Sequence, residues 1–266
     1  MCKKINWMFL CSILLILSLS VGAFASSSGY HWYCVRNREH KQPRMDGSLS
    51  MIEQYDGYYV DRKHGDDCED KVIYLTFDAG YENGNIEKIL NTLKEEQAPG
   101  AFFILGNLIE RNPEIVLRME AEGHLVCNHS DKHRCMTSYT SAEEMKADLS
   151  TLEARYTELT GKTMAPYYRP PEGKFDERTL GFASKLGYKT IFWSFAYADW
   201  DNDRQPNPAE AKKKILDNIH NGAVLLLHPT SSTNAAILGE VIAELKAEGY
   251  RFGTLDELTA PSPDPR

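Results

Sequence analysis

The sequence is poor in cysteine, has no excess of positive charge and contains no internal repeat. Six cysteines in 266 residues are too few for a disulfide scaffold, so a chain of this length must rely on one sizeable hydrophobic core. A net charge of −8 gives no general attraction to nucleic acid, and any attraction to an anionic glycan must be local. The lack of repeats and low-complexity segments argues against a structural cell-wall protein.

The longest apolar run lies at the amino terminus. It extends from about Trp7 to Val21, follows Lys3 and Lys4, and precedes the small-residue pattern Ala23-Phe24-Ala25. This order is typical of a secretory signal peptide. We therefore interpret residues 1–25 as a signal, and we expect a secreted protein without a stable membrane span after cleavage. The alternative is an uncleaved membrane anchor, for which the apolar run is short.

The rest of the chain divides into three parts. Residues 26–70 are polar and irregular with scattered aromatic side chains, which predicts an extension that packs on the main domain. Residues 71–259 form that domain, and the prolines in residues 260–266 indicate a short disordered tail. The four cysteines beyond the signal pair as Cys34–Cys68 and Cys127–Cys135 or remain thiols, and the sequence leaves both arrangements open.

From Lys71 onward, strand-like and helix-like segments alternate about seven times. Val72–Phe77 is a run of β-branched and aromatic residues, whereas residues 85–96 carry apolar side chains at helical spacing. Ala223–Leu227 is the most apolar strand-like run, and such a run suits a strand buried on both faces. This order predicts an α/β fold with a parallel sheet and outer helices, either an open doubly wound sheet or a barrel.

In both architectures, functional side chains gather where strands end. The ends of the predicted strands carry carboxylates, imidazoles and a guanidinium, at Asp78, His129, Arg169, Asp199 and His228. Each such residue alone usually has a structural role, but their convergence at one edge indicates a catalytic site. His133 follows His129 by four residues, and a pair of imidazoles suits a borderline divalent ion.

Taken together, these segments resemble the polysaccharide deacetylase family, the NodB-homology enzymes of carbohydrate esterase family 4. The resemblance covers about residues 71–258 and implies a distorted (β/α) barrel of about seven parallel strands with outer helices. Within the family, the run 76–84, the aromatic extension and the run 193–200 are most similar to the delta-lactam-biosynthetic peptidoglycan de-N-acetylases. The motifs that carry the resemblance occur in the family's order: Thr76–Gly80, His129–His133, Arg169–Gly173, Asp199-Trp200 and Leu225–His228.

The resemblance implies a role for each matched residue. Asp78 is the expected general base, paired with Arg169, and His228 is the expected general acid, oriented by Asp199. A divalent metal, Zn²⁺ or similar, is expected on the two remaining imidazoles. The full set of expected site residues is Asp78, His228, Asp199 and Arg169 for catalysis, Trp200, Leu226, Glu172 and Asn83 for substrate binding, and His129 and His133 for the metal.

Two positions depart from the family's pattern. Ala79 stands where the family usually has an aspartate that ligates the metal, and Glu172 stands where an aromatic residue is usual. Either waters complete the metal site, or another oxygen such as that of Asp131 or Asn83 replaces the aspartate, or no metal binds tightly. We therefore expect weak metal binding and an altered sugar subsite.

The resemblance also implies the substrate. We expect a monomeric hydrolase that acts on peptidoglycan glycan strands, at N-acetylmuramic acid stripped of its peptide, on the route to the muramic δ-lactam of the spore cortex. The alternatives are deacetylation of peptidoglycan N-acetylglucosamine or chitin-like oligomers, and a non-catalytic glycan-binding module. The alanine at position 79 is the best argument for the last of these.

Overall fold

The computed structural model describes residues 29–36 and 39–261. The predicted signal peptide and most of the predicted tail lie outside these residues. No helix within the described part of the chain is long and apolar enough to cross a bilayer.

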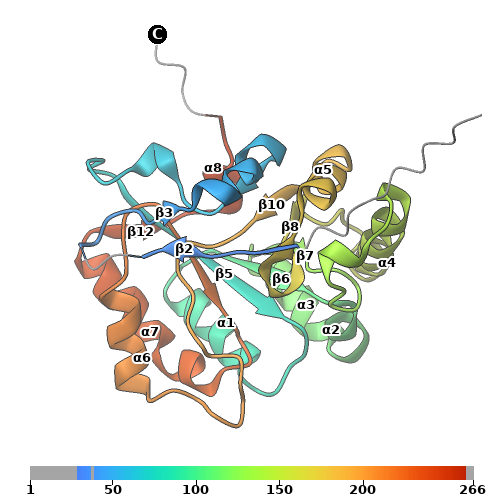
Figure 1. Ribbon diagram of the computed structural model, residues 1–266. Helices are drawn as coiled ribbons and strands as arrows, with labels where there is room; N and C mark the ends of the chain where they lie inside the picture. Colours follow the sequence, from blue (N-terminus) through green and yellow to red (C-terminus); the bar gives the residue numbers. More distant parts are fainter. Residues whose placement is uncertain (1–28, 37–38, 262–266) are drawn as a thin grey trace, which may run out of the picture.

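A parallel sheet with helices around it forms the main body (Figure 1). Strand β5 (Lys71–Ala79) is buried almost along its whole length, because its apolar side chains pack against helices on one face and fill the interior of the curled sheet on the other. Its neighbours on both sides run parallel to it, which confirms the prediction of a parallel α/β sheet. The strands follow the spatial order β11 (Ala223–Leu227), β5 (Lys71–Ala79), β6 (Gly100–Ile104), β7 (Leu125–Asn128), β8 (Tyr167–Tyr168), β10 (Lys189–Ile191) and β4 (Gly57–Tyr58), and β12 (Tyr250–Phe252) also pairs with β5.

The two edges of this sheet approach each other. Val60, just after β4, forms an isolated antiparallel bridge with Ala223 of β11, and Phe195 forms a parallel bridge with Leu225. The sheet is thus a distorted barrel whose edges are joined by single bridges rather than by a full ladder. Of the two architectures that the pattern left open, the barrel is present, and the distorted barrel that the resemblance implied is confirmed.

The helices surround the sheet and begin at recognisable caps. The Asp176 side chain accepts a hydrogen bond from the backbone N–H of Thr179, and the backbone N–H of Asp176 donates to the Thr179 hydroxyl, which completes a capping box. The Ser141 side chain caps the 19-residue helix that follows it by accepting from the backbone N–H of Glu144. Apolar side chains of these helices cover the outer face of the strands. The helices are α1 (Ile86–Glu95), α2 (Gly106–Arg111), α3 (Pro113–Ala121), α4 (Ala142–Thr160), α5 (Glu177–Lys185), α6 (Pro208–Leu216), α7 (Ser232–Ala247) and α8 (Leu255–Leu258), with short 3₁₀ turns η1 (Gly47–Tyr55), η2 (Arg62–His64), η3 (Met136–Ser138) and η4 (Pro171–Gly173).

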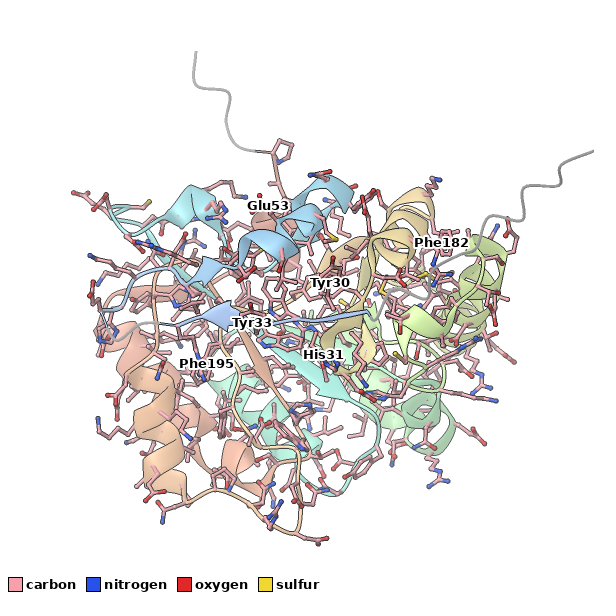
Figure 2. All side chains as sticks on the ribbon, viewed as in Figure 1. Tyr30, His31, Tyr33, Glu53, Phe182 and Phe195 are labelled. Atoms are coloured by element: carbon pink, nitrogen blue, oxygen red, sulfur yellow. The ribbon has the colours of Figure 1, made fainter. Side chains whose placement is uncertain are left out.

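The amino-terminal segment crosses the molecule in front of the main sheet (Figure 2). Strand β1 (Tyr30–His31) pairs with β9 (Lys174–Phe175), and β2 (Cys34–Val35) pairs with β3 (Arg44–Met45). The Trp32 indole stacks on Phe192 with ring centroids 4.6 Å apart. This segment therefore packs through aromatic side chains, and it also supplies strand β4 to the main sheet.

All four cysteines in the described part of the chain are free thiols. Cys127 is buried in β7, and the Cys34 thiol donates a hydrogen bond to the carbonyl of Ser194 at 3.2 Å. Of the two arrangements that the sequence left open, the structure contains the thiols.

Candidate active site

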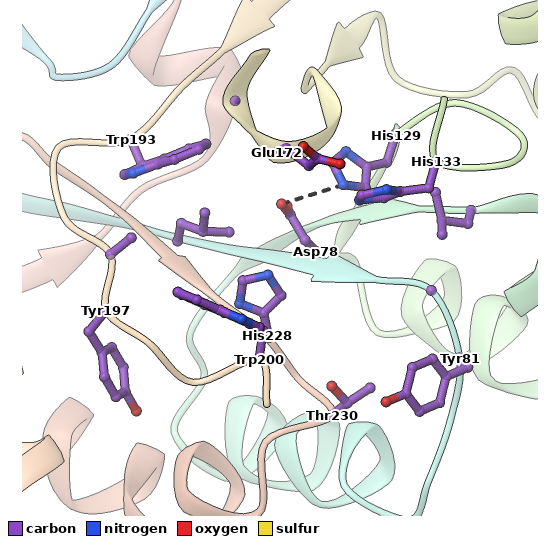
Figure 3. Close-up of a pocket in the computed structure, with 15 residues that line it drawn as sticks. Asp78, Tyr81, His129, His133, Glu172, Trp193, Tyr197, Trp200, His228 and Thr230 are labelled. Atoms are coloured by element: carbon purple, nitrogen blue, oxygen red, sulfur yellow. Dashed lines mark ion pairs between the residues drawn. The ribbon is translucent and has the colours of Figure 1, made fainter. Parts of the chain in front are cut away.

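A cavity of about 570 Å³ opens where β5, β7 and β11 end (Figure 3). It brings together side chains that come from motifs far apart in the sequence. Seven of the predicted site residues line it: Asp78, His129, His133, Glu172, Trp200, Leu226 and His228.

Asp78 lies at the end of β5 and is paired with a buried cation. Its Oδ1 accepts a hydrogen bond from Nη1 of Arg169 at 2.8 Å. Arg169 is fully buried, and its remaining contacts include Thr76 Oγ1 at 2.8 Å and the carbonyl of Ile191 at 3.0 Å. Burial alone would raise the pKa of Asp78, but the charges of Arg169 and the neighbouring histidines hold that pKa below its ordinary value. Asp78 is therefore an anion at neutral pH.

The two histidines of the second motif meet across a tight loop. Ser130 and His133 have φ angles of 70° and 57°, in the left-handed region that non-glycine residues seldom occupy. The rings of His129 and His133 have centroids 5.1 Å apart. A helix would also bring residues four apart together, but here the strained loop does so.

His129 is held as a neutral imidazole. Its Nδ1 lies 2.8 Å from the carbonyl of Arg169, so Nδ1 carries the proton and Nε2 keeps its lone pair. Burial lowers the pKa of His129 to about 4. Nε2 faces Asp78 Oδ2 at 3.6 Å (Figure 3). Figure 3 shows His133 beside it, on the same side of the cavity.

His228 and Asp199 form a second pair. Nδ1 of His228 lies 2.7 Å from Asp199 Oδ1, and the backbone N–H of His228 donates to Asp199 Oδ2 at 2.9 Å. Burial disfavours the charged imidazole, yet the hydrogen bond and the charge of Asp199 raise the pKa of His228 above its ordinary value. Asp199 is itself buried and does not line the cavity.

The remaining predicted residues differ in their placement. Trp200 is 59% exposed at the cavity mouth, with its ring centroid 6.1 Å from that of His228. Leu226 is a buried part of the wall. Glu172 is about half exposed, has φ 59°, and forms an ion pair with Lys174.

Asn83 and Asp131 do not line the cavity. Asn83 is exposed, and its side chain donates a hydrogen bond to the carbonyl of the lining residue Thr230 at 2.9 Å. The carboxylate of Asp131 faces Arg155 at 3.5 Å. Among the described residues, Asp131 forms no three-residue metal-binding group with the two imidazoles.

Several lining residues had been given no role from the sequence. Trp193 and Tyr197 lie in the run 193–200, which is part of the family resemblance, but the sequence assigned them no function. Tyr81 directly follows the first motif. Only their position directly beside motif residues could have indicated them. The additional lining residues are Gly80, Tyr81, Leu105, Gly173, Trp193, Ala196, Tyr197 and Thr230.

The donor set fits a divalent ion. Two neighbouring imidazoles are ligands that zinc-like ions prefer. In one of them, His129, a backbone carbonyl accepts from Nδ1 and leaves Nε2 for the ion, which is the usual hydrogen bond behind a metal-bound histidine. Ala79 is buried in the apolar core and offers no oxygen. Within residues 29–36 and 39–261, no three His, Cys, Asp or Glu side chains already form a metal-binding group.

Comparison with known proteins gives consistent matches. The polysaccharide deacetylase family model matches residues 65–191. An uncharacterized 30.6 kDa protein of Geobacillus stearothermophilus is 41% identical over 93% of this chain and 92% of its own length. The peptidoglycan-N-acetylmuramic acid deacetylase PdaA of Bacillus subtilis is 36% identical over 95% of both chains.

Structural comparison agrees with these matches. The structure of Bacillus subtilis PdaA, a family 4 carbohydrate esterase, superposes with a TM-score of 0.81 and covers 87% of this chain and 97% of that one. A further sequence match is the peptidoglycan-N-acetylglucosamine deacetylase PgdA of Listeria monocytogenes, which is 35% identical over 71% of this chain and 39% of its own length.

Proposed function

Because the chain belongs to the polysaccharide deacetylase family, we propose that it removes the N-acetyl group from peptide-free N-acetylmuramic acid in peptidoglycan strands. The free amine is the precursor of the muramic δ-lactam of the spore cortex. One observation carries the proposal: Asp78 and His228, which come from different strands, line one cavity. The match to PdaA over nearly the whole of both chains supports the choice of sugar.

Asp78 acts as the general base. Its lowered pKa keeps the carboxylate ionised at neutral pH, where it accepts a proton from the water that attacks the acetyl carbonyl. Arg169 fixes the orientation of this carboxylate through the 2.8 Å hydrogen bond to Oδ1, which leaves Oδ2 directed toward the imidazole side of the cavity.

His228 acts as the general acid. The proton leaves its ring for the departing amine as the carbon–nitrogen bond breaks. Asp199 holds the ring through Nδ1 and raises the pKa of His228, so the protonated form persists near neutral pH.

His129 and His133 would hold a divalent ion such as Zn²⁺. When bound, the ion supplies Lewis-acid polarisation of the acetyl carbonyl and lowers the pKa of water. Because Ala79 contributes no ligand, we propose that this ion binds more weakly than in a site with a carboxylate at that position.

The cavity walls place the sugar. Trp200 and Leu226 enclose the acetyl methyl group, and Glu172 contacts the sugar at the rim. Asn83 contributes to sugar binding indirectly, because its amide donates a hydrogen bond to the carbonyl of the lining residue Thr230. We further propose that the protein works as a secreted monomer on the cell wall or spore cortex, after removal of residues 1–25.

A second candidate is deacetylation of N-acetylglucosamine in peptidoglycan. The match to PgdA favours it, but that match covers a smaller part of both chains than the match to PdaA. The non-catalytic alternative does not explain why both hydrogen-bonded pairs, the base with its cation and the acid with its carboxylate, are present.

The test compares purified protein on intact and on peptide-stripped peptidoglycan, with Asp78→Asn protein as the matched control. We expect acetate release from the stripped polymer, with free muramic amine or its lactam in the products by mass spectrometry. Acetate release with glucosamine as the free amine would select the second candidate. No acetate from either polymer, with excess Zn²⁺ present, would refute both.

A further inference from the structure

A chain of buried hydrogen bonds lies behind the His228–Asp199 pair. The amide of Asn234, on α7, donates from Nδ2 to Asp199 Oδ2 at 2.6 Å and to the carbonyl of His228 at 3.0 Å. On its other side, Asn234 Oδ1 accepts a hydrogen bond from the hydroxyl of Tyr197. Asn234 is 1% exposed, so all three contacts are shielded from water.

Both ends of this chain reach the cavity. Tyr197 and His228 line it, whereas Asn234 and Asp199 lie behind the wall. Asn234 is therefore the link between two parts of the cavity surface, although it is too deeply buried to touch a substrate.

The start of α7 fixes Asn234 itself. The Ser231 side chain caps the helix by accepting from the backbone N–H of Asn234 at 3.1 Å. Gln205 binds the same helix start, because its Oε1 accepts from Ser231 Oγ at 2.5 Å, and its Nε2 donates to the carbonyl of Asp199 at 2.9 Å. The loop that carries Asp199 is thus attached to α7 through both its backbone and its side chain.

We propose that Asn234 is a positioning residue of the deacetylase reaction, which holds the Asp199 carboxylate so that Oδ1 faces Nδ1 of His228. A carboxylate on a single bond can rotate. Here the donors of Asn234 and of the His228 backbone both occupy Oδ2 and leave Oδ1 for the ring. Removal of Asn234 leaves one backbone donor, so the carboxylate is free to turn away from the imidazole. The catalytic meaning of this contact rests on the proposed function, but the contact itself does not.

Three other side chains act on the His228 ring. Asp78 and Arg169 contribute opposite charges from across the cavity, and the Trp200 ring lies edge-on to the imidazole. Substitution of Asn234 changes none of these directly, so a changed pKa of His228 reports on Asp199.

The experiment uses Asn234→Leu, which keeps the side-chain size but removes donor and acceptor. Asn234→Ser is the second variant if leucine impairs folding. Thr233→Val is the matched control, because Thr233 Oγ1 donates to the carbonyl of Pro206 at 2.7 Å in the same helical turn and does not contact Asp199. The pKa of His228 is measured by NMR in protein with labelled histidine, with His228→Gln to identify the signal, and kcat and KM are measured by acetate release from the N-acetylated, peptide-stripped peptidoglycan.

We expect the pKa of His228 to fall in the Asn234 variants and to stay unchanged in Thr233→Val. We also expect kcat to fall by about tenfold to a hundredfold with KM nearly unchanged, because the proton transfer occurs only in the transition state. An unchanged or raised pKa of His228 in the Asn234 variants would overturn the inference. Since the NMR measurement needs no turnover, it decides the inference even if the wild-type protein releases no acetate, which would refute the proposed function alone.

Discussion

Nη1 of Arg169 lies 2.8 Å from Oδ1 of Asp78, and the guanidinium that makes this contact is completely removed from solvent. The same guanidinium lies 4.2 Å from the centre of the Phe103 ring. A cation in such surroundings requires its anion, since an unpaired buried charge is strongly unfavourable. The proposed base is therefore also the counter-ion that allows Arg169 to be buried.

Replacement of Arg169 by Met is expected to destabilise the protein by about 3–5 kcal/mol, because Asp78 then stays buried without its cation. Urea unfolding monitored by circular dichroism measures the loss. The double variant Arg169→Met, Asp78→Asn should recover part of it, because neither charge remains. If the double variant is less stable than Arg169→Met alone, the pairing is not the source of the loss.

Replacement of Asp78 by Asn is expected to lower kcat by about a hundredfold to ten thousandfold, the usual contribution of a general base. The amide keeps the shape but cannot accept the proton from water. Acetate release under substrate saturation gives kcat, and the urea midpoint of the same sample separates lost chemistry from lost folding. Retention of wild-type kcat would remove Asp78 from the mechanism.

The pH dependence of kcat/KM should be bell-shaped. The pKa of Asp78 is lowered from 3.8, so the base is lost only as the pH falls below that value. His129 becomes cationic near its pKa of about 4 and then cannot bind a metal, which steepens the acidic limb. The pKa of His228 is raised from 6.5, so the acid is lost as the pH rises above that value.

The measurement is acetate release from about pH 3 to pH 10, a range that covers both limbs. In the Asp199→Asn variant the carboxylate that raises the pKa of His228 is gone, so the alkaline limb should move to lower pH. An alkaline limb that stays in place in this variant would show that another group controls it.

Metal removal should reduce activity reversibly. With only two imidazole ligands, a chelator is expected to strip the ion readily, and Zn²⁺ titration should show micromolar rather than nanomolar binding. His133→Gln should weaken binding further, whereas His31→Gln, which changes an exposed histidine of β1, should not. Nanomolar binding by the wild-type protein would show that a further ligand completes the site.

The long buried strands could be predicted from the sequence because they are covered on both faces. Val72–Phe77 and Ala223–Leu227 are continuous apolar runs, and the structure contains β5 and β11 there. Strand β4 at Gly57–Tyr58 was not predicted, because two residues with a glycine show no alternation and acquire their strand conformation only from β10.

The site was partly predictable for a related reason. Residues at strand ends, such as Asp78 and His228, are placed by the fold, so their chain positions already indicate a shared cavity. Asn234 lies inside a helix, and Asp131 lies within the histidine motif. Nothing in the sequence distinguishes the amide that contacts Asp199 from a surface asparagine, or shows that the Asp131 carboxylate turns toward Arg155.

The position of β4 in the sheet affects the order in which the chain can fold. Gly57–Tyr58 emerges early in synthesis, but its hydrogen-bonding partner is β10, and its neighbour Val60 bridges to β11, which emerges later still. Such distant pairings form late and slowly. Strand β4 must therefore remain unpaired while most of the chain is synthesised. A protease that cuts between residues 60 and 71 before then would remove the covalent link between β4 and the sheet whose edge it forms.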